Sequence, residues 1–169
     1  TLAHEFQHVF AEPYLYPSSR RFDNWRDRWE DTIIRRIVSE GVAMQCNPPS
    51  GFKKDVYEDT IVVKFWLHEL ENTIRQIRDS KTTEDSVCAW LDRSYHDTAR
   101  QQLLDYLKRT YPQENQSALL NDHISERPSC IYTLGWWMVS HITATAGGRE
   151  QAIDLLSSPH RLFEIYNTG

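Results

Sequence analysis

The stretch IIRRIVSEGVAMQ, residues 33–45, decides the fold of this chain. Its apolar residues recur three and four positions apart, which is the spacing of one face of an α-helix. The pattern predicts a helix over residues 23–45 that ends at the segment CNPPSG. Gly41 lies within the apolar stripe, although a Gly inside a helix costs about 1 kcal/mol relative to Ala. We therefore expect another helix to approach closely at Gly41.

The helical period recurs along almost the whole chain, and no run alternates convincingly with the period of two that a strand requires. The sequence predicts an all-α (mainly α) helical bundle, folded as a single domain over residues 1–169. The first helix should cover residues 2–10 and stop before Pro13, because proline breaks helices. Further helices are expected at residues 55–79, 83–91, 99–111, 113–123, 131–146, 149–158 and 159–167.

The composition argues against several classes of function. Of 169 residues, 40% are hydrophobic and 25% are charged, which is ordinary for a globular domain. A net charge of -5 argues against a nucleic-acid partner. No apolar run approaches the about 18 residues of a membrane span, and the absence of a CxxC pair argues against a cysteine zinc site. Compartment and oligomeric state stay open.

The segment HEFQH, residues 4–8, has the His-Glu-x-x-His spacing of a metal site. On a helix, His4 and His8 share one face and could bind one metal ion, while Glu5 lies beside them as a general base. A chain of this composition would contain the motif by accident only about 0.02 times. The similar segment HELEN, residues 68–72, has Asn72 in place of the second histidine and predicts an exposed helix face.

Two related classes of metal site are excluded by the neighbouring residues. An extended motif with a third histidine would need Gly and His where this chain has Ala11 and Tyr14. A di-iron site of the ferritin type would need two Glu-x-x-His pairs, and Glu5-x-x-His8 is the only one in the chain.

Glu40 is the third metal ligand that we predict, because a catalytic zinc ion usually has three protein ligands. It falls at the edge of the apolar stripe of the helix over residues 23–45, and Gly41 beside it would let the histidine-bearing helix come close. Glu30 and Asp31 are alternatives on the same helix. Glu40 could also be a partly exposed acid without a metal role.

Together, HEFQH and the segment SEGVA about thirty residues later resemble the gluzincin clan of metallopeptidases, to which thermolysin belongs. The later segment YTLGWWMVSHI is similar to uncharacterised bacterial families of zinc-dependent peptidases. The resemblance implies Zn²⁺ bound by His4, His8 and Glu40, with Glu5 as general base. One position departs from the pattern. Thermolysin-like enzymes have an Asp four residues after the ligand Glu to orient a histidine, and this chain has Met44 there.

The resemblance also implies a donor that stabilises the oxyanion from a downstream helix. Tyr132 is our preferred candidate, because it flanks the apolar stripe of the helix over residues 131–146. His141 flanks the other side, and Tyr14 and Tyr16 follow the histidine motif directly. Gly135 lies inside the same stripe and predicts a second close helix contact.

The sequence thus favours a zinc-dependent peptidase that acts on a peptide or protein substrate. The alternatives are a non-catalytic helical metal-binding or interaction domain, such as a degenerate or truncated peptidase, and a chance motif in a plain helical bundle. Because the motif begins at the fourth residue, we expect a longer natural helix there. The chain would then be the metal-binding, C-terminal part of a gluzincin-like peptidase that lacks an upstream N-terminal portion.

Overall fold

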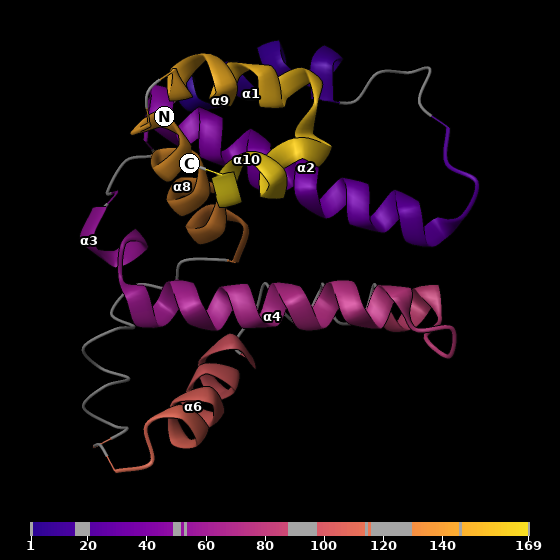
Figure 1. Cartoon of the computed structure of the whole chain (residues 1–169), viewed down its shortest axis with the longest axis vertical. Helices are drawn as coiled ribbons and strands as arrows, with labels where there is room; N and C mark the ends of the chain where they lie inside the picture. Colours follow the sequence, from indigo (N-terminus) through magenta and orange to yellow (C-terminus); the bar gives the residue numbers. More distant parts are fainter. Residues whose placement is uncertain are drawn as a thin grey trace. The chain divides into compact units, whose positions relative to one another are not determined.

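The structure is a computed structural model that describes residues 2–15, 21–48, 52, 54–87, 98–113, 115, 130–145 and 147–168. These residues are mainly helical and include no strand, so the all-α prediction is confirmed (Figure 1). In chain order the helices are α1 (Leu2–Leu15), α2 (Trp25–Cys46), α3 (Lys54–Tyr57), α4 (Thr60–Arg78), α6 (Thr98–Thr110), α8 (Cys130–Thr143), α9 (Gly148–Ser157), the 3₁₀ turn η1 (Pro159–Arg161) and α10 (Leu162–Thr168).

The chain divides into two compact units. The first unit combines Thr1–Phe52 with Leu134–Gly169, and the second is Lys53–Thr133. The single domain expected over the whole chain stays a prediction. No helix in the described part of the chain is long and apolar enough to cross a membrane.

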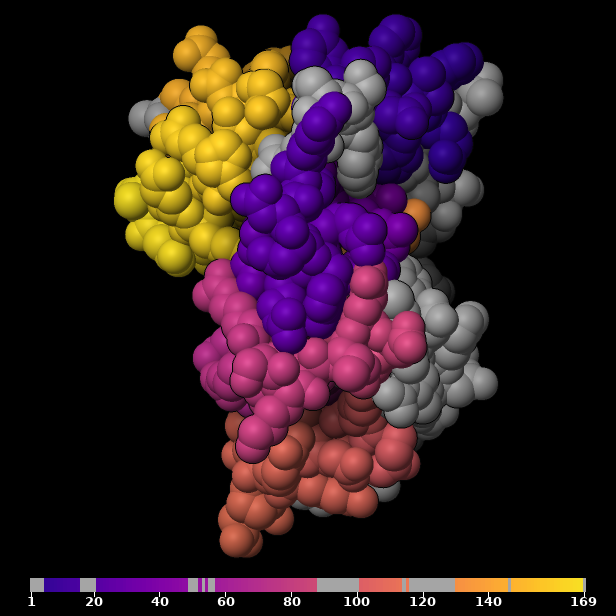
Figure 2. Space-filling view, turned by 90° about the vertical axis from the view of Figure 1, so that its right-hand side faces the viewer, coloured from indigo at the N-terminus to yellow at the C-terminus, as the bar shows by residue number. Residues whose placement is uncertain are grey.

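Helix α2 is the central element of the first unit. The Asn24 side chain caps its N-terminus by accepting a hydrogen bond of 3.0 Å from the backbone N–H of Asp27. Its apolar face is buried, with Ile37 and Val38 fully enclosed. Helices α1 and α9 and the turn η1 pack against it, and Figure 2 shows the C-terminal elements in yellow beside it. The helix that the pattern in residues 33–45 predicts is therefore the central helix of this unit, against which its neighbours pack.

Gly41 lies at a close contact, but the partner differs from the one expected. A Cβ at Gly41 would lie 2.4 Å from the carbonyl oxygen of Gly135, on α8. A Cβ at Gly135 would lie 2.7 Å from the carbonyl oxygen of Ile37. The two glycines therefore form one seam between α2 and α8. The expectation that Gly41 faces the histidine-bearing helix was wrong, because helical spacing does not identify which helix packs on a glycine.

Replacing Gly41 by Ala should destabilise the first unit, although Ala is the better helix former. The added Cβ would meet backbone atoms of α8, which cannot rotate away as a flexible side chain could. Overpacking of this kind typically costs about 1–3 kcal/mol. Urea unfolding followed by circular dichroism measures the change. Gly147→Ala is a useful comparison, because a Cβ there meets nothing within 4 Å and only the positive φ of 74° is strained. An unchanged or raised stability of the Gly41→Ala variant would contradict the seam.

Helix α1 continues to Leu15 and contains Pro13, so the expected stop before Pro13 was wrong. Pro13 cannot donate to the carbonyl of Val9, but both residues are exposed and water can reach that carbonyl. Leu15 is fully buried, and the buried guanidinium of Arg35 on α2 donates a hydrogen bond to its carbonyl. This positive charge also lies at the C-terminal end of the helix dipole. Packing against α2 thus holds the last turn.

In the second unit, the helix expected over residues 55–79 is divided into α3 and α4. Asp59 interrupts it, because its side chain accepts hydrogen bonds from the backbone N–H groups of Ile61 and Val62 and so caps α4. The rings of Phe65 on α4 and Tyr106 on α6 lie 5.6 Å apart and join the two helices.

Most of the remaining helix predictions agree with the structure where it describes them. Helices α6, α8 and α9, with η1 and α10, occupy the predicted segments. Of the segment predicted at residues 83–91, residues 84–87 are helical and 88–91 lie outside the described residues. The predicted helix over 113–123 also lies outside them, apart from residues 113 and 115, which are not helical.

Candidate metal centre

His8 on α1 and Glu40 on α2 meet where the two helices pack together. The Nε2 atom of His8 lies 3.3 Å from the Oε2 atom of Glu40, and both side chains are partly buried. Because 31 residues separate the two positions, local helix geometry alone does not bring His8 and Glu40 together. The packing of α1 against α2 brings them together. The hydrogen bond from Arg35 to the carbonyl of Leu15 supports this packing.

The separation of these two donor atoms suits a shared zinc ion. Zinc binds imidazole nitrogen and carboxylate oxygen at about 2.0–2.2 Å, so two ligand atoms of a tetrahedral site lie about 3.4 Å apart. The 3.3 Å between Nε2 of His8 and Oε2 of Glu40 is close to that value. A strong charge-assisted hydrogen bond would be shorter, at about 2.7–2.9 Å. The pair therefore fits two ligands of one ion.

Ser39 orients the imidazole of His8. The Ser39 Oγ atom lies 2.8 Å from Nδ1 of His8. When Nδ1 carries the proton it donates to this hydroxyl, and the lone pair of Nε2 is then available to a metal ion. This hydrogen bond provides the orienting contact that Met44 cannot, and Met44 is fully buried in the core. Ser39 was not predicted from the sequence, where its only signal is its place directly before the predicted ligand Glu40.

Replacing Ser39 by Ala should weaken zinc binding about 10–100-fold, because removal of a partner that orients a ligand typically has this effect. Competition with a chromogenic chelator measures the zinc affinity. The matched control is Ser140→Ala, since Ser140 is also partly buried in the first unit but its hydroxyl accepts a hydrogen bond from Gln45. Equal zinc affinities of the Ser39→Ala variant and the wild-type chain would refute the orienting role.

A cleft of about 350 Å³ opens beside the pair. Glu5 lies at its wall, three residues before His8 and thus on the same side of α1. Glu5 is exposed, so its carboxylate is accessible to water. The basic side chain of Arg36 also lines the cleft, which was not expected from the sequence. The remaining lining residues are Val9, Glu12, Leu15 and Ser39.

The third predicted ligand, His4, lies in α1, but its side chain is outside the described residues. The metal roles of His4, His8 and Glu40 therefore stay predictions. In the part of the chain with described side chains, no group of three His, Cys, Asp or Glu residues could hold a metal ion. Of the alternative ligands, Asp31 forms an ion pair with the buried Arg35.

Of the candidate oxyanion donors, His141 and Tyr14 are described in the first unit and do not line the cleft. Tyr132 is at the start of α8 and belongs to the second unit, so its role stays a prediction. The ring of His141 lies 5.2 Å from the ring of Tyr166. Tyr14 is 63% exposed and does not line the cleft, and Tyr16 is outside the described residues.

Comparison with known proteins gives a family whose description names zinc, independently of this geometry. Residues 1–168 match a family model described as "Putative zinc dependent peptidase (DUF5700)". The match covers nearly the whole chain, including both helices of the candidate centre. No curated protein and no solved structure matches the chain.

Proposed function

The chain belongs to the family so described, and on that premise we propose that it is a zinc-dependent peptidase that hydrolyses peptide bonds as a gluzincin-type enzyme. The observation that carries the proposal is the pairing of His8 and Glu40 at 3.3 Å, with Ser39 on the far nitrogen of the imidazole. This geometry suits two zinc ligands with an outer hydrogen-bond partner, and so supports the proposal. The proposed third ligand is His4, one helical turn before His8.

Each residue of the centre has a distinct role in the proposal. His4, His8 and Glu40 would hold the zinc ion, which would supply Lewis acidity at the site. Glu5 accepts a proton from the attacking water and later donates it to the leaving amine. Its place on the wall of the cleft, on the same side of α1 as His8, suits this transfer.

Tyr132 remains the proposed donor to the oxyanion, with His141, Tyr14 and Tyr16 as alternatives. The cleft adds Arg36 as a further candidate, because a guanidinium at the wall favours developing negative charge.

Metal analysis of the purified chain together with a peptidase assay tests the proposal. We expect about one zinc ion per chain, because the proposed centre has one set of three ligands. Digestion of a mixed peptide library, read by mass spectrometry, should stop when 1,10-phenanthroline removes the metal and resume when zinc is restored. A chain that binds zinc but cleaves no peptide would instead support a non-catalytic metal-binding domain. A chain without bound zinc would refute the metal centre.

A further inference from the structure

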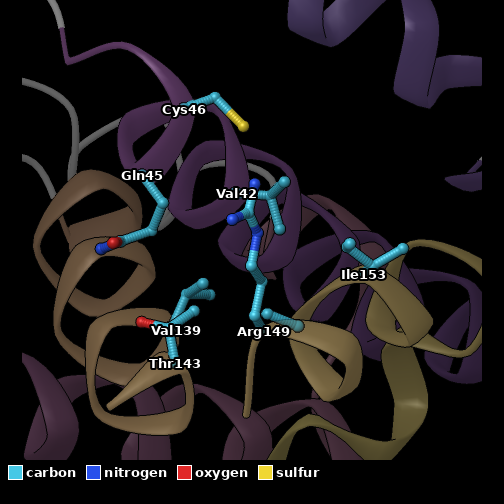
Figure 3. A pocket seen from close by; sticks show the side chains of 8 residues that line it. Val42, Gln45, Cys46, Val139, Thr143, Arg149 and Ile153 are labelled. Carbon is cyan, nitrogen blue, oxygen red and sulfur yellow. The ribbon is translucent and has the colours of Figure 1, made fainter. Parts of the chain in front are cut away.

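A second cleft, of about 560 Å³, lies in the first unit between α2, α8 and α9 (Figure 3). It shares no lining residue with the cleft at the candidate metal centre. Its volume is within the range of about 300–1,000 Å³ that is typical of small-molecule sites. The lining residues are Val42, Gln45, Cys46, Val139, Thr143, Arg149, Ala152 and Ile153.

The lining combines an apolar wall with one positive charge. Four of its residues are Val, Ala or Ile, which suits an aliphatic ligand surface. Arg149 is the one charged residue that lines the cleft, and no acid faces it from the lining. Figure 3 shows its side chain extending from α9 toward Val42 on α2. In the described part of the chain, its guanidinium forms no ion pair or hydrogen bond.

Polar groups at the cleft are limited to a few positions. The amide nitrogen of Gln45 donates a hydrogen bond to the hydroxyl of Ser140, which leaves the Gln45 carbonyl oxygen as an acceptor. The Thr143 hydroxyl donates to the backbone carbonyl of Ser140 at 3.0 Å. The cleft therefore has a mainly apolar surface with a neutral polar edge. The guanidinium of Arg149 is its one positively charged hydrogen-bond donor for an anion.

We propose that this cleft binds a small organic carboxylate with an aliphatic body. A guanidinium has the fork geometry and charge that match a carboxylate, and the valine, alanine and isoleucine side chains would cover the aliphatic part. The same chemistry occurs at the C-terminal residue of an aliphatic peptide and in a medium-chain fatty acid. The proposal does not depend on the zinc centre, because the two clefts have no residue in common.

Cys46 provides a direct readout of ligand binding. It is an exposed free cysteine that lines the cleft, so a bound ligand should slow its alkylation by iodoacetamide. Burial, together with the nearby carboxylate of Glu69, raises the pKa of the Cys130 thiol to about 12. Cys130 is therefore almost fully protonated at neutral pH and should react slowly. Mass spectrometry of peptides resolves Cys46 from the other cysteines.

The probes are octanoate and N-acetyl-leucine, each compared with its uncharged amide. We expect each carboxylate that binds to slow the alkylation of Cys46 saturably, with little protection by its amide. Protection by N-acetyl-leucine alone would identify a peptide C-terminus as the source, and protection by octanoate alone a fatty acid. Equal protection by acid and amide, or no saturable protection by either acid, would overturn the proposal.

The variant Arg149→Gln tests whether the guanidinium itself binds the carboxylate of the ligand. It should lower the affinity for the protecting carboxylate by about tenfold or more, because it removes a charged hydrogen-bond donor. The matched control Arg161→Gln removes one exposed positive charge elsewhere in the first unit and should leave protection unchanged. If Arg149 only stabilises the C-terminal end of α2 through the helix dipole, its replacement will not change protection, and the proposal fails.

Discussion

Replacing Glu5 by Gln is expected to leave zinc bound and to reduce peptide hydrolysis about 10²–10⁴-fold, the usual contribution of a general base. The amide has nearly the same shape as the carboxylate but cannot accept the proton of the attacking water. Glu5 is exposed and does not contribute to the core, so the variant should fold as the wild-type chain does. Zinc content and cleavage rate, measured on the same sample, separate the loss of metal from the loss of catalysis.

Glu12 offers a matched control on the same helix. It is also exposed, and it lines the same cleft seven residues further along α1. The variant Glu12→Gln should retain most of the activity, because its carboxylate lies about two helical turns from Glu5. If Glu12→Gln caused the large loss and Glu5→Gln did not, Glu12 would be the base. Full activity of the Glu5→Gln variant would show that the proposed proton transfer is wrong.

Replacing Glu40 by Ala should lower the zinc affinity more than replacing Ser39 by Ala does. The change removes a proposed ligand itself, so the loss of affinity should exceed the about 10–100-fold effect of removing an outer partner such as Ser39. Peptide hydrolysis should fall in parallel. Glu40 is partly buried beside His8, so circular dichroism should accompany the metal titration to verify that the helices remain.

Glu30→Ala is the control for this experiment, because Glu30 is on the same helix and is one of the two alternative ligands, with Asp31, that the sequence allows. We expect its zinc affinity to match that of the wild-type chain. Undiminished zinc binding by the Glu40→Ala variant would remove Glu40 from the ligand set. Loss of zinc in the Glu30→Ala variant alone would transfer the role to Glu30.

The candidate site was accessible from sequence only in part. The spacing of His4, Glu5 and His8 is local, so one helical turn is enough to relate them. Glu40 was inferred as a partner from its place beside an apolar stripe, and the structure places its carboxylate next to His8. Ser39 and Arg36 could not be inferred with equal force, because single hydroxyl and basic residues on a helix have no distinguishing spacing.

Sequence alone determined the helical class, the extent of α2 and the regions of most other helices, because these depend on periodicity and on caps within a few residues. Tertiary structure decided the outcomes that depend on residues far apart in the chain. The packing partner of Gly41 is Gly135, and the last turn of α1 persists through Pro13 because Leu15 is buried and Arg35 binds its carbonyl. Such outcomes follow from which helix faces pack together, and a local pattern does not encode that choice.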